Sequence, residues 1–152
     1  MTDPIRLLLA DDQQMVRAGF RLVLDAQPDM SVVGEANDGA EAVQLVDELA
    51  PDVVLMDIRM PVLDGLGATE KIMTGHPEAK ILVLTTFDLD EYVHSALRAG
   101  ASGFMLKDAG PTELLAAIRA VRDGDSVVAP SATRRLIERF IPRQGEGAAT
   151  TT

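Results

Sequence analysis

Three aspartates, two threonines and one lysine follow four short apolar runs of the chain, each at the point where a run ends. They are Asp11, Asp12, Asp57, Thr85, Thr86 and Lys107. Carboxylates within a few ångströms of one another repel, which raises the pKa of at least one of them unless a cation shares the site. Oxygen ligands with room for water favour a hard divalent ion, Mg²⁺ or else Mn²⁺. The aspartates therefore predict a metal site wherever the fold brings them together.

The lysine and the threonines add groups that suit phosphoryl transfer. The ammonium group of Lys107 is a point charge that can meet a phosphoryl oxygen, and Thr85 offers a hydroxyl donor. A carboxylate can itself act as the nucleophile, and the product is then an aspartyl phosphate. The set as a whole resembles a phosphoryl-transfer centre.

Five apolar runs, alternating with helix-length segments, must position these side chains. The runs cover residues 5–10, 31–36, 53–56, 80–84 and 103–106. Their nearly continuous hydrophobicity is typical of parallel strands that are covered on both faces. Helical patterns cover residues 13–26, 39–49, 64–74, 89–99 and 111–123. This repeated β-α order predicts an α/β fold, a doubly wound, five-stranded parallel sheet with five flanking helices.

The order of the strands decides where the candidate residues meet. In the flavodoxin-like order 2-1-3-4-5, ligands bind outside the carboxyl ends of the strands, at the switch between strands 1 and 3. Those two strands carry the three aspartates. Each residue alone has an ordinary explanation, because aspartate caps helices and starts turns, threonine favours strands and lysine is usually solvated. Four such placements on one sheet edge favour a functional site.

Local signals also mark the ends and the buried faces of the predicted helices. Asp38 and Glu41 resemble a capping box at the start of the second helix. Gly75 and Gly100 suit positions just after a helix, and Pro111 suits a first helical turn. The expected core-facing positions of the first two helices are Val16, Phe20, Val23, Ala42, Val46 and Leu49.

Composition narrows the function classes. A chain of 152 residues, 47% of them hydrophobic, is long enough for one domain with one sizeable core. Its net charge of −10 disfavours direct binding to nucleic acid. With no cysteine, the chain has no disulfide, thiolate metal site or cysteine nucleophile. It shows neither a cationic leader nor a long apolar stretch, so we expect a cytoplasmic protein without membrane contact.

Five segments resemble the receiver domain of two-component response regulators, specifically the NarL/FixJ subfamily, whose members usually carry a C-terminal LuxR-type helix-turn-helix. The segments are LADD at 9–12, NDGAEA at 37–42, VLMDIRMPVLDG at 54–65, LTTFD at 84–88 and AGASGFMLKD at 99–108. The resemblance covers about residues 5 to 123 and implies a CheY-like fold. The pattern departs in one place, because Asp108 follows the lysine where many receivers have proline.

The resemblance implies a role for each candidate residue. Asp57 would accept a phosphoryl group from the phosphohistidine of a sensor histidine kinase. Asp12 would bind Mg²⁺ directly, Asp11 largely through water, and the backbone carbonyl of Arg59 would complete the protein ligands together with Asp57. Lys107 would pair with a phosphoryl oxygen. The remaining roles concern the switch: the Thr85 hydroxyl would move toward the phosphate, Phe104 would turn inward, and the small Thr86 would leave the phosphoryl group accessible.

Domain organisation and partners follow from the same resemblance. We expect a receiver over residues 1–124, a linker with a helical segment over 125–143 and a disordered tail over 144–152. The tail is too short for a helix-turn-helix, so DNA binding would need a domain that this chain lacks, and we expect the chain to be part of a longer protein. The resemblance also implies homodimerisation tuned by phosphorylation, through the first and fifth helices or through the face formed by the fourth helix, the fifth strand and the fifth helix.

Two alternatives to this signalling switch use the same residues. A phosphohydrolase of the haloacid dehalogenase type would want a D-x-D motif and a cap, whereas Asp11 and Asp12 are adjacent and no cap insertion is present. We therefore expect a phosphoacceptor and not a turnover enzyme. A pseudo-receiver would bind partners without phosphorylation, and the intact acidic pair, Asp57, Thr85 and Lys107 speak against it.

Overall fold

A parallel β-sheet forms the centre of the computed structural model, which describes residues 3–85, 90–125 and 127–128. Its strand order is β2-β1-β3-β4-β5-β6, so the predicted order 2-1-3-4-5 is confirmed. The strands are β1 (Ile5–Ala10), β2 (Met30–Ala36), β3 (Val53–Asp57), β4 (Ile81–Thr85), β5 (Gly103–Leu106) and β6 (Val127–Val128). The short β6 extends the predicted five strands and pairs with β5 through Gly103 and Phe104. Two valines are too few to show a hydrophobic period, so the sequence predicted a linker there.

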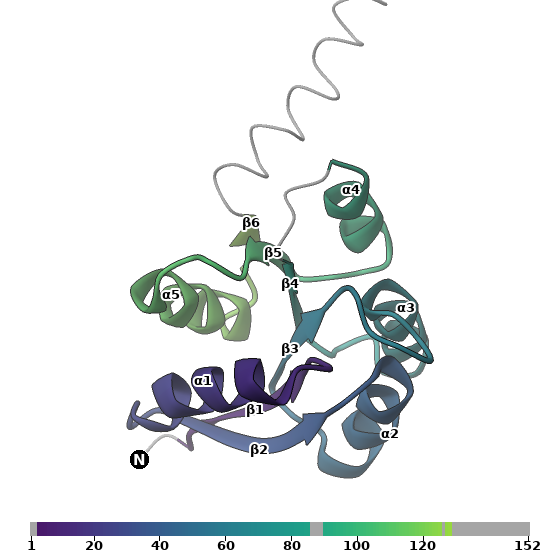
Figure 1. Cartoon of the computed structure of the whole chain (residues 1–152). Coiled ribbons are helices and arrows are strands. Elements are labelled where there is room, and N and C mark those ends of the chain that lie inside the picture. Colours follow the sequence, from purple (N-terminus) through teal and green to yellow (C-terminus); the bar gives the residue numbers. More distant parts are fainter. Residues whose placement is uncertain (1–2, 86–89, 126, 129–152) are drawn as a thin grey trace, which may run out of the picture.

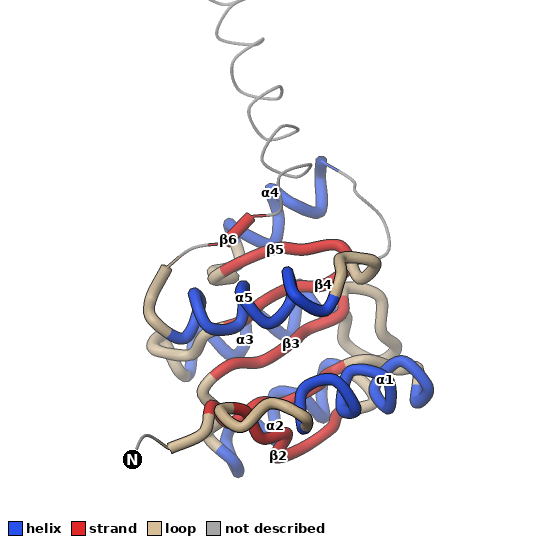
Figure 2. The backbone as a smooth tube through the Cα atoms, turned by 90° about the vertical axis from the view of Figure 1, so that its left-hand side faces the viewer, coloured by secondary structure: helices blue, strands red, loops and turns tan. Residues whose placement is uncertain are grey.

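Within the part of the chain that the structure describes, five helices cover the two faces of the sheet, as predicted. They are α1 (Gln14–Asp25), α2 (Gly39–Leu49), α3 (Gly65–Gly75), α4 (Asp90–Arg98) and α5 (Pro111–Arg122). Helices α1 and α5 lie on one face, and α2, α3 and α4 lie on the other (Figures 1 and 2). No helix within the described residues is long and apolar enough to cross a lipid bilayer.

Each face of the sheet has its own hydrophobic core, because successive side chains of a strand point to opposite faces. On β1, Leu7 and Leu9 pack with α1 and α5, whereas Leu8 and Ala10 pack with the helices of the other face. Burial on both faces explains why the strands are nearly continuously apolar. Because the strands themselves are apolar, the polar residues at their ends stand out in the sequence.

The helix ends follow the predicted signals with one exception. Asp38 accepts a hydrogen bond from the Glu41 amide at 2.7 Å, while the Glu41 carboxylate reaches back to the amide of Asn37, one residue before the cap. Pro111 begins α5, and Gly100 has a φ of +105° just after α4. The prediction for Gly75 is wrong: it is the last residue of α3, whose cap is His76. The His76 amide closes the last turn on the Ile72 carbonyl, so no left-handed glycine is needed.

The buried face of α1 differs from the predicted one. Val16, Phe20 and Val23 are only partly buried, whereas the buried residues of this helix are Arg17 and Leu24. Hydrophobic periodicity cannot anticipate Arg17, because a buried cation depends on partners that lie elsewhere in the sequence. In α2 the prediction is confirmed for Ala42 and Val46, which are buried, and Leu49 is partly buried.

Candidate functional site

The predicted site residues meet at the carboxyl edge of the sheet. Asp11 and Asp12 follow β1, Asp57 ends β3, Thr85 ends β4 and Lys107 follows β5. The strands are in parallel register, so their ends lie side by side. In addition, the Lys107 amide donates a 2.7 Å hydrogen bond to the Thr85 carbonyl, which ties the end of β5 to the end of β4.

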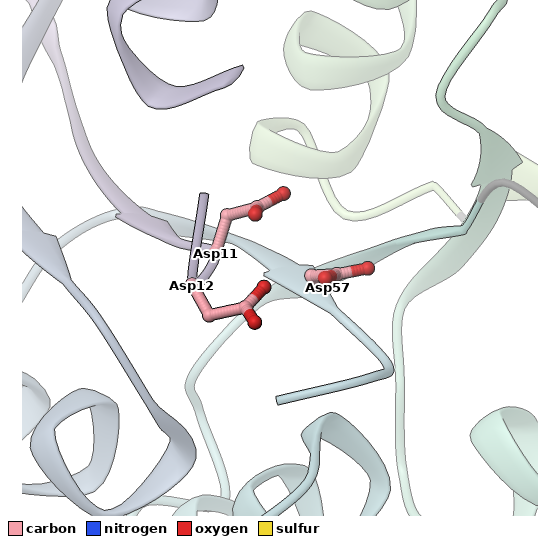
Figure 3. A group of neighbouring side chains, drawn as sticks. All are labelled: Asp11, Asp12 and Asp57. Carbon is pink, nitrogen blue, oxygen red and sulfur yellow. The ribbon is translucent and has the colours of Figure 1, made fainter. Parts of the chain in front are cut away.

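The three aspartates form one acidic cluster (Figure 3). Each offers a carboxylate oxygen, and these oxygens all lie within 4.8 Å of one another. Asp11 and Asp57 are buried, and Asp12 is exposed. Three carboxylates at this separation can hold a metal ion, and the exposed position of Asp12 leaves water access to the cluster.

Lys107 connects two members of the acidic cluster. Its ammonium nitrogen lies 2.5 Å from Oδ2 of Asp11 and 3.3 Å from Oδ1 of Asp57. Burial by itself lowers the pKa of Lys107, but the close contact of its ammonium group with the Asp11 carboxylate and the charges of both aspartates outweigh burial and raise that pKa. Lys107 therefore carries a permanent positive charge beside Asp57.

Asp57 has the most unusual electrostatic surroundings of the cluster. Burial raises the pKa of its carboxyl to about 6, against an ordinary value of 3.8; Lys107 opposes this change, and the charges of Asp11 and Asp12 add to it. At neutral pH the Asp57 carboxyl is mainly ionised, although it is poorly solvated and is repelled by the negative charges of Asp11 and Asp12. A neighbouring cation, or reaction with an electrophile, stabilises such a carboxylate more than it stabilises a solvated one.

The cluster fits a hard divalent cation on its own chemistry. All its donors are oxygens, and the buried Oδ2 of Asp11 receives no well-aligned hydrogen bond from the described residues, its close partner being the Lys107 ammonium. Asp12 lines an open hollow together with Arg59 and Met60, so the predicted carbonyl ligand, Arg59, lies beside the acidic cluster.

The loop between β3 and α3 is held close to Asp57 by tight backbone contacts. The Gly65 amide donates to the Ile58 carbonyl at 2.7 Å, and a Cβ atom at Gly65 would lie 2.0 Å from the Asp57 carbonyl oxygen. Glycine is therefore required there by close approach. Val62, which the sequence reasoning did not single out, has a φ of +71° inside a three-residue turn closed by the Leu63 amide and the Pro61 carbonyl. A β-branched residue gives no sequence signal for that conformation.

The predicted switch residues lie on β4 and β5. Thr85 is buried, and Phe104 is fully buried in the core beside α2, α3 and α4. Val83 and Phe104 belong to the same core, on one face of the sheet. Thr85 lies two residues after Val83 on β4, so its side chain points to that same face. The peptide bond between Lys107 and Asp108 is trans. Thr86, the tail over 144–152 and most of the predicted linker over 125–143 lie outside the described residues.

Comparison with known proteins identifies this arrangement. The family model described as the response regulator receiver domain matches residues 7–119, which include all three aspartates and Lys107. The chain belongs to this family. The receiver is 48% identical over 143 residues to the uncharacterized transcriptional regulatory protein YxjL of Bacillus subtilis, covering 93% of this chain and 66% of that protein.

Two further relatives agree with this assignment. The oxygen regulatory protein NreC of Staphylococcus aureus is 46% identical over 149 residues, covering 97% of this chain and 69% of that protein. The crystal structure of a LuxR-family two-component response regulator from Aurantimonas superposes with a TM-score of 0.87 at 34% identity, covering 91% of this chain and 99% of that one. The receiver thus spans about two thirds of the length of these curated relatives.

The family and the relatives place the receiver in phosphorelay signalling. It resembles regulators of the LuxR family, which are signalling proteins and not turnover enzymes. The acidic cluster of Asp11, Asp12 and Asp57 is where a receiver of this kind could hold a metal ion.

Proposed function

We propose that Asp57 is the phosphoacceptor of this receiver and takes its phosphoryl group from the phosphohistidine of a sensor histidine kinase. One observation carries the proposal: a buried carboxylate at the end of β3 lies 3.3 Å from the Lys107 ammonium and beside two more carboxylates. Transfer would form a bond between an Asp57 oxygen and phosphorus while the bond from phosphorus to the histidine nitrogen breaks. Lys107 would pair with a phosphoryl oxygen.

The reaction would depend on Mg²⁺, with Mn²⁺ as a substitute. Asp11, Asp12, Asp57 and the Arg59 carbonyl would hold the ion, as the oxygen-only donor set favours. When bound, such an ion supplies positive charge that offsets the aspartates and the phosphoryl oxygens. The raised pKa of Asp57 supports this part of the proposal, since burial and the charges of Asp11 and Asp12 act against the ionised carboxylate and Lys107 offsets them only in part.

The output would be a change of surface around α4, β5 and α5. A phosphoryl group adds about −1.5 to −2 charge and strong acceptor oxygens. The Thr85 hydroxyl would move toward them, Thr86 would leave room for them, and Phe104 would fill the space that Thr85 vacates. Phe104 is fully buried in this structure and shares a sheet face with Thr85, as this proposal requires. Contacts that differ by a few kcal/mol suffice to shift such a two-state equilibrium.

Beyond this chain, we propose that the receiver controls a transcriptional output domain. DNA would be bound by a helix-turn-helix outside this sequence, because the receiver itself carries a net charge of −10. A cytoplasmic location, homodimerisation tuned by phosphorylation, and the division into a receiver over 1–124, a linker over 125–143 and a tail over 144–152 belong to the same proposal.

Acetyl phosphate with Mg²⁺ tests the proposal without knowledge of the kinase. Intact-mass analysis after rapid quenching should show one added phosphoryl group on the wild-type chain and none on Asp57→Asn. The matched control is Asp52→Asn, because Asp52 is an exposed aspartate just before the other end of β3. Equal labelling of Asp57→Asn would point to another acceptor, and an unlabelled wild type would favour a pseudo-receiver.

A further inference from the structure

Arg17 is a buried cation on α1 that none of the proposed steps uses. It is one of only five polar or charged residues that are buried among the described residues. Its Nη1 donates to the backbone carbonyl of Asp11 at 2.5 Å, and its Nε donates to the carboxylate of Glu35 on β2 at 2.8 Å. The guanidinium therefore links the first helix, the second strand and the loop of the acidic pair.

The carbonyl that Arg17 holds belongs to the peptide group between Asp11 and Asp12. A peptide group is rigid and planar, so the direction of this carbonyl sets the orientation of the backbone on both sides. The Asp11 amide on the preceding side donates to the Ala36 carbonyl at 3.1 Å. The Asp11 carboxylate accepts from the Gln13 amide at 2.9 Å. With Arg17 in place, the amide, the carbonyl and the carboxylate of Asp11 each have a hydrogen-bond partner.

Glu35 fixes the guanidinium in turn. One of its oxygens accepts from Arg17, and the other accepts from Arg21, one helical turn further along α1, at 2.5 Å. The hydrogen bond from Arg17 is the main reason why the pKa of Glu35 lies below its usual value; burial opposes it, and Arg21 adds to it. Glu35 therefore remains charged at any pH at which the protein works, and Arg17 has a permanent anchor.

Packing alone does not explain an arginine at this position. A buried ion pair costs desolvation, and an apolar side chain of similar volume usually stabilises a fold as well or better. Leu24, the other buried residue of α1, shows that this face accepts an aliphatic side chain. A planar, forked donor is needed, however, to reach a carbonyl and a carboxylate at once.

We propose that Arg17 is a positioning residue for the cation site: it fixes the peptide group between Asp11 and Asp12 and thereby presents both carboxylates to the ion. This inference rests on the proposed function, in which the acidic pair binds Mg²⁺. Arg17 itself touches neither the ion nor the phosphoryl group.

Geometry and charge make opposite predictions for the loss of Arg17. Its positive charge repels a cation, so removal of the charge alone would tighten the binding of any divalent ion. Loss of the positioning contact would weaken binding, and it would weaken Mg²⁺ more than Ca²⁺. Mg²⁺ demands near-ideal octahedral geometry, whereas Ca²⁺ accepts irregular ligand sets. The sign of the change and the Mg²⁺/Ca²⁺ ratio therefore separate positioning from charge and from general stability.

The experiment is a titration of the 152-residue chain with Mn²⁺, followed by electron paramagnetic resonance, with Mg²⁺ and Ca²⁺ as competitors. Arg17→Met should lower Mg²⁺ affinity by about tenfold or more, as removal of groups that orient metal ligands does, and Ca²⁺ affinity by less. The matched control is Arg21→Met, which removes the same charge from the same helix and the same Glu35 but leaves the Asp11 carbonyl bonded. It should bind both ions as tightly as the wild type or slightly more tightly.

The results of these titrations test the positioning role of Arg17 and the proposed function separately. If Arg17→Met binds Mg²⁺ as tightly as the wild type or more tightly, the positioning role is wrong. If the wild type itself shows no Mn²⁺ binding that Mg²⁺ displaces, the proposed function fails first. If Arg17→Met does not fold, Arg17→Lys supplies the test, because lysine keeps the charge but cannot reach the Asp11 carbonyl and the Glu35 carboxylate at once. Unchanged Mg²⁺ affinity and an unchanged ratio of Mg²⁺ to Ca²⁺ affinity in that variant would overturn the inference.

Discussion

Replacement of Asp57 by asparagine should stabilise the metal-free receiver at neutral pH, although it removes the proposed phosphoacceptor. The folded protein raises the pKa of the Asp57 carboxyl to about 6, against 3.8 for the ordinary group. Folding therefore favours the protonated form, and holding the ionised form at pH 7 costs up to about 3 kcal/mol. Asparagine is nearly the same size and carries no charge, so the variant avoids this cost.

The sign and the pH window of the effect follow from the two pKa values. Well below its ordinary pKa of 3.8 the carboxyl is protonated in both the folded and the unfolded chain, so it contributes no penalty. As the pH rises from about 3 to 7, the unfolded chain releases its proton first, and the wild type loses stability relative to the variant. Above about pH 7 the difference is constant. The value of about 3 kcal/mol already includes the 3.3 Å ion pair with Lys107, because that attraction is one of the causes that set the pKa of Asp57.

Urea unfolding in the presence of a chelator, from pH 4 to pH 8, measures this directly. The free energy of unfolding of Asp57→Asn minus that of the wild type should be smallest at pH 4 and reach a plateau above about pH 7. Asp52→Asn, which changes an exposed carboxylate, should show no such rise. An Asp57→Asn variant that is less stable than the wild type at pH 7 would refute the reasoning on burial and like charges.

Two further predictions concern the backbone around the site. Val62→Gly should raise the free energy of unfolding by about 1 kcal/mol, because it relieves a β-branched residue held at a φ of +71°. Val62→Ala keeps the Cβ atom and should therefore be stabilised less. Equal stabilisation of the two variants would contradict the strain argument. Gly65→Ala should cost about 3 kcal/mol or more in the same urea assay and abolish phosphoryl labelling, because its Cβ atom would lie 2.0 Å from the Asp57 carbonyl oxygen. Its control is Gly19→Ala in α1, where a Cβ meets nothing within 4 Å and helix propensity predicts a gain of about 1 kcal/mol.

The part of the site that could be predicted from sequence is the part that topology dictates. Parallel strands end at a common edge, so Asp11, Asp57 and Lys107 could be brought together from strand assignments alone. The apolar runs were unambiguous because both faces of the sheet are covered, and β1 and β5 have the predicted bounds. The capping residue Asp38 and the first-turn Pro111 depend only on residues close to them in the sequence, so their roles could be predicted as well.

What could not be predicted depends on contacts between distant parts of the chain. Arg17 is buried because Glu35 and the Asp11 carbonyl receive its hydrogen bonds, and no pattern within α1 encodes those partners. Val62 takes a left-handed conformation because the Leu63 and Gly65 backbones are held by Gly39 and Ile58. The sequence predicted a raised pKa for at least one of the three aspartates, but not that Asp57 would be the one or that burial in the assembled sheet would be the main cause.

Borohydride trapping followed by peptide mapping is the most direct test of the central claim, that Asp57 carries the phosphoryl group. Borohydride reduces an aspartyl phosphate to homoserine, which marks the acceptor position permanently. After incubation with acetyl phosphate and Mg²⁺, we predict homoserine at position 57 alone, and none when a chelator replaces Mg²⁺. Homoserine at position 11 or 12, or an unmodified chain under conditions that label a known receiver, would contradict the account.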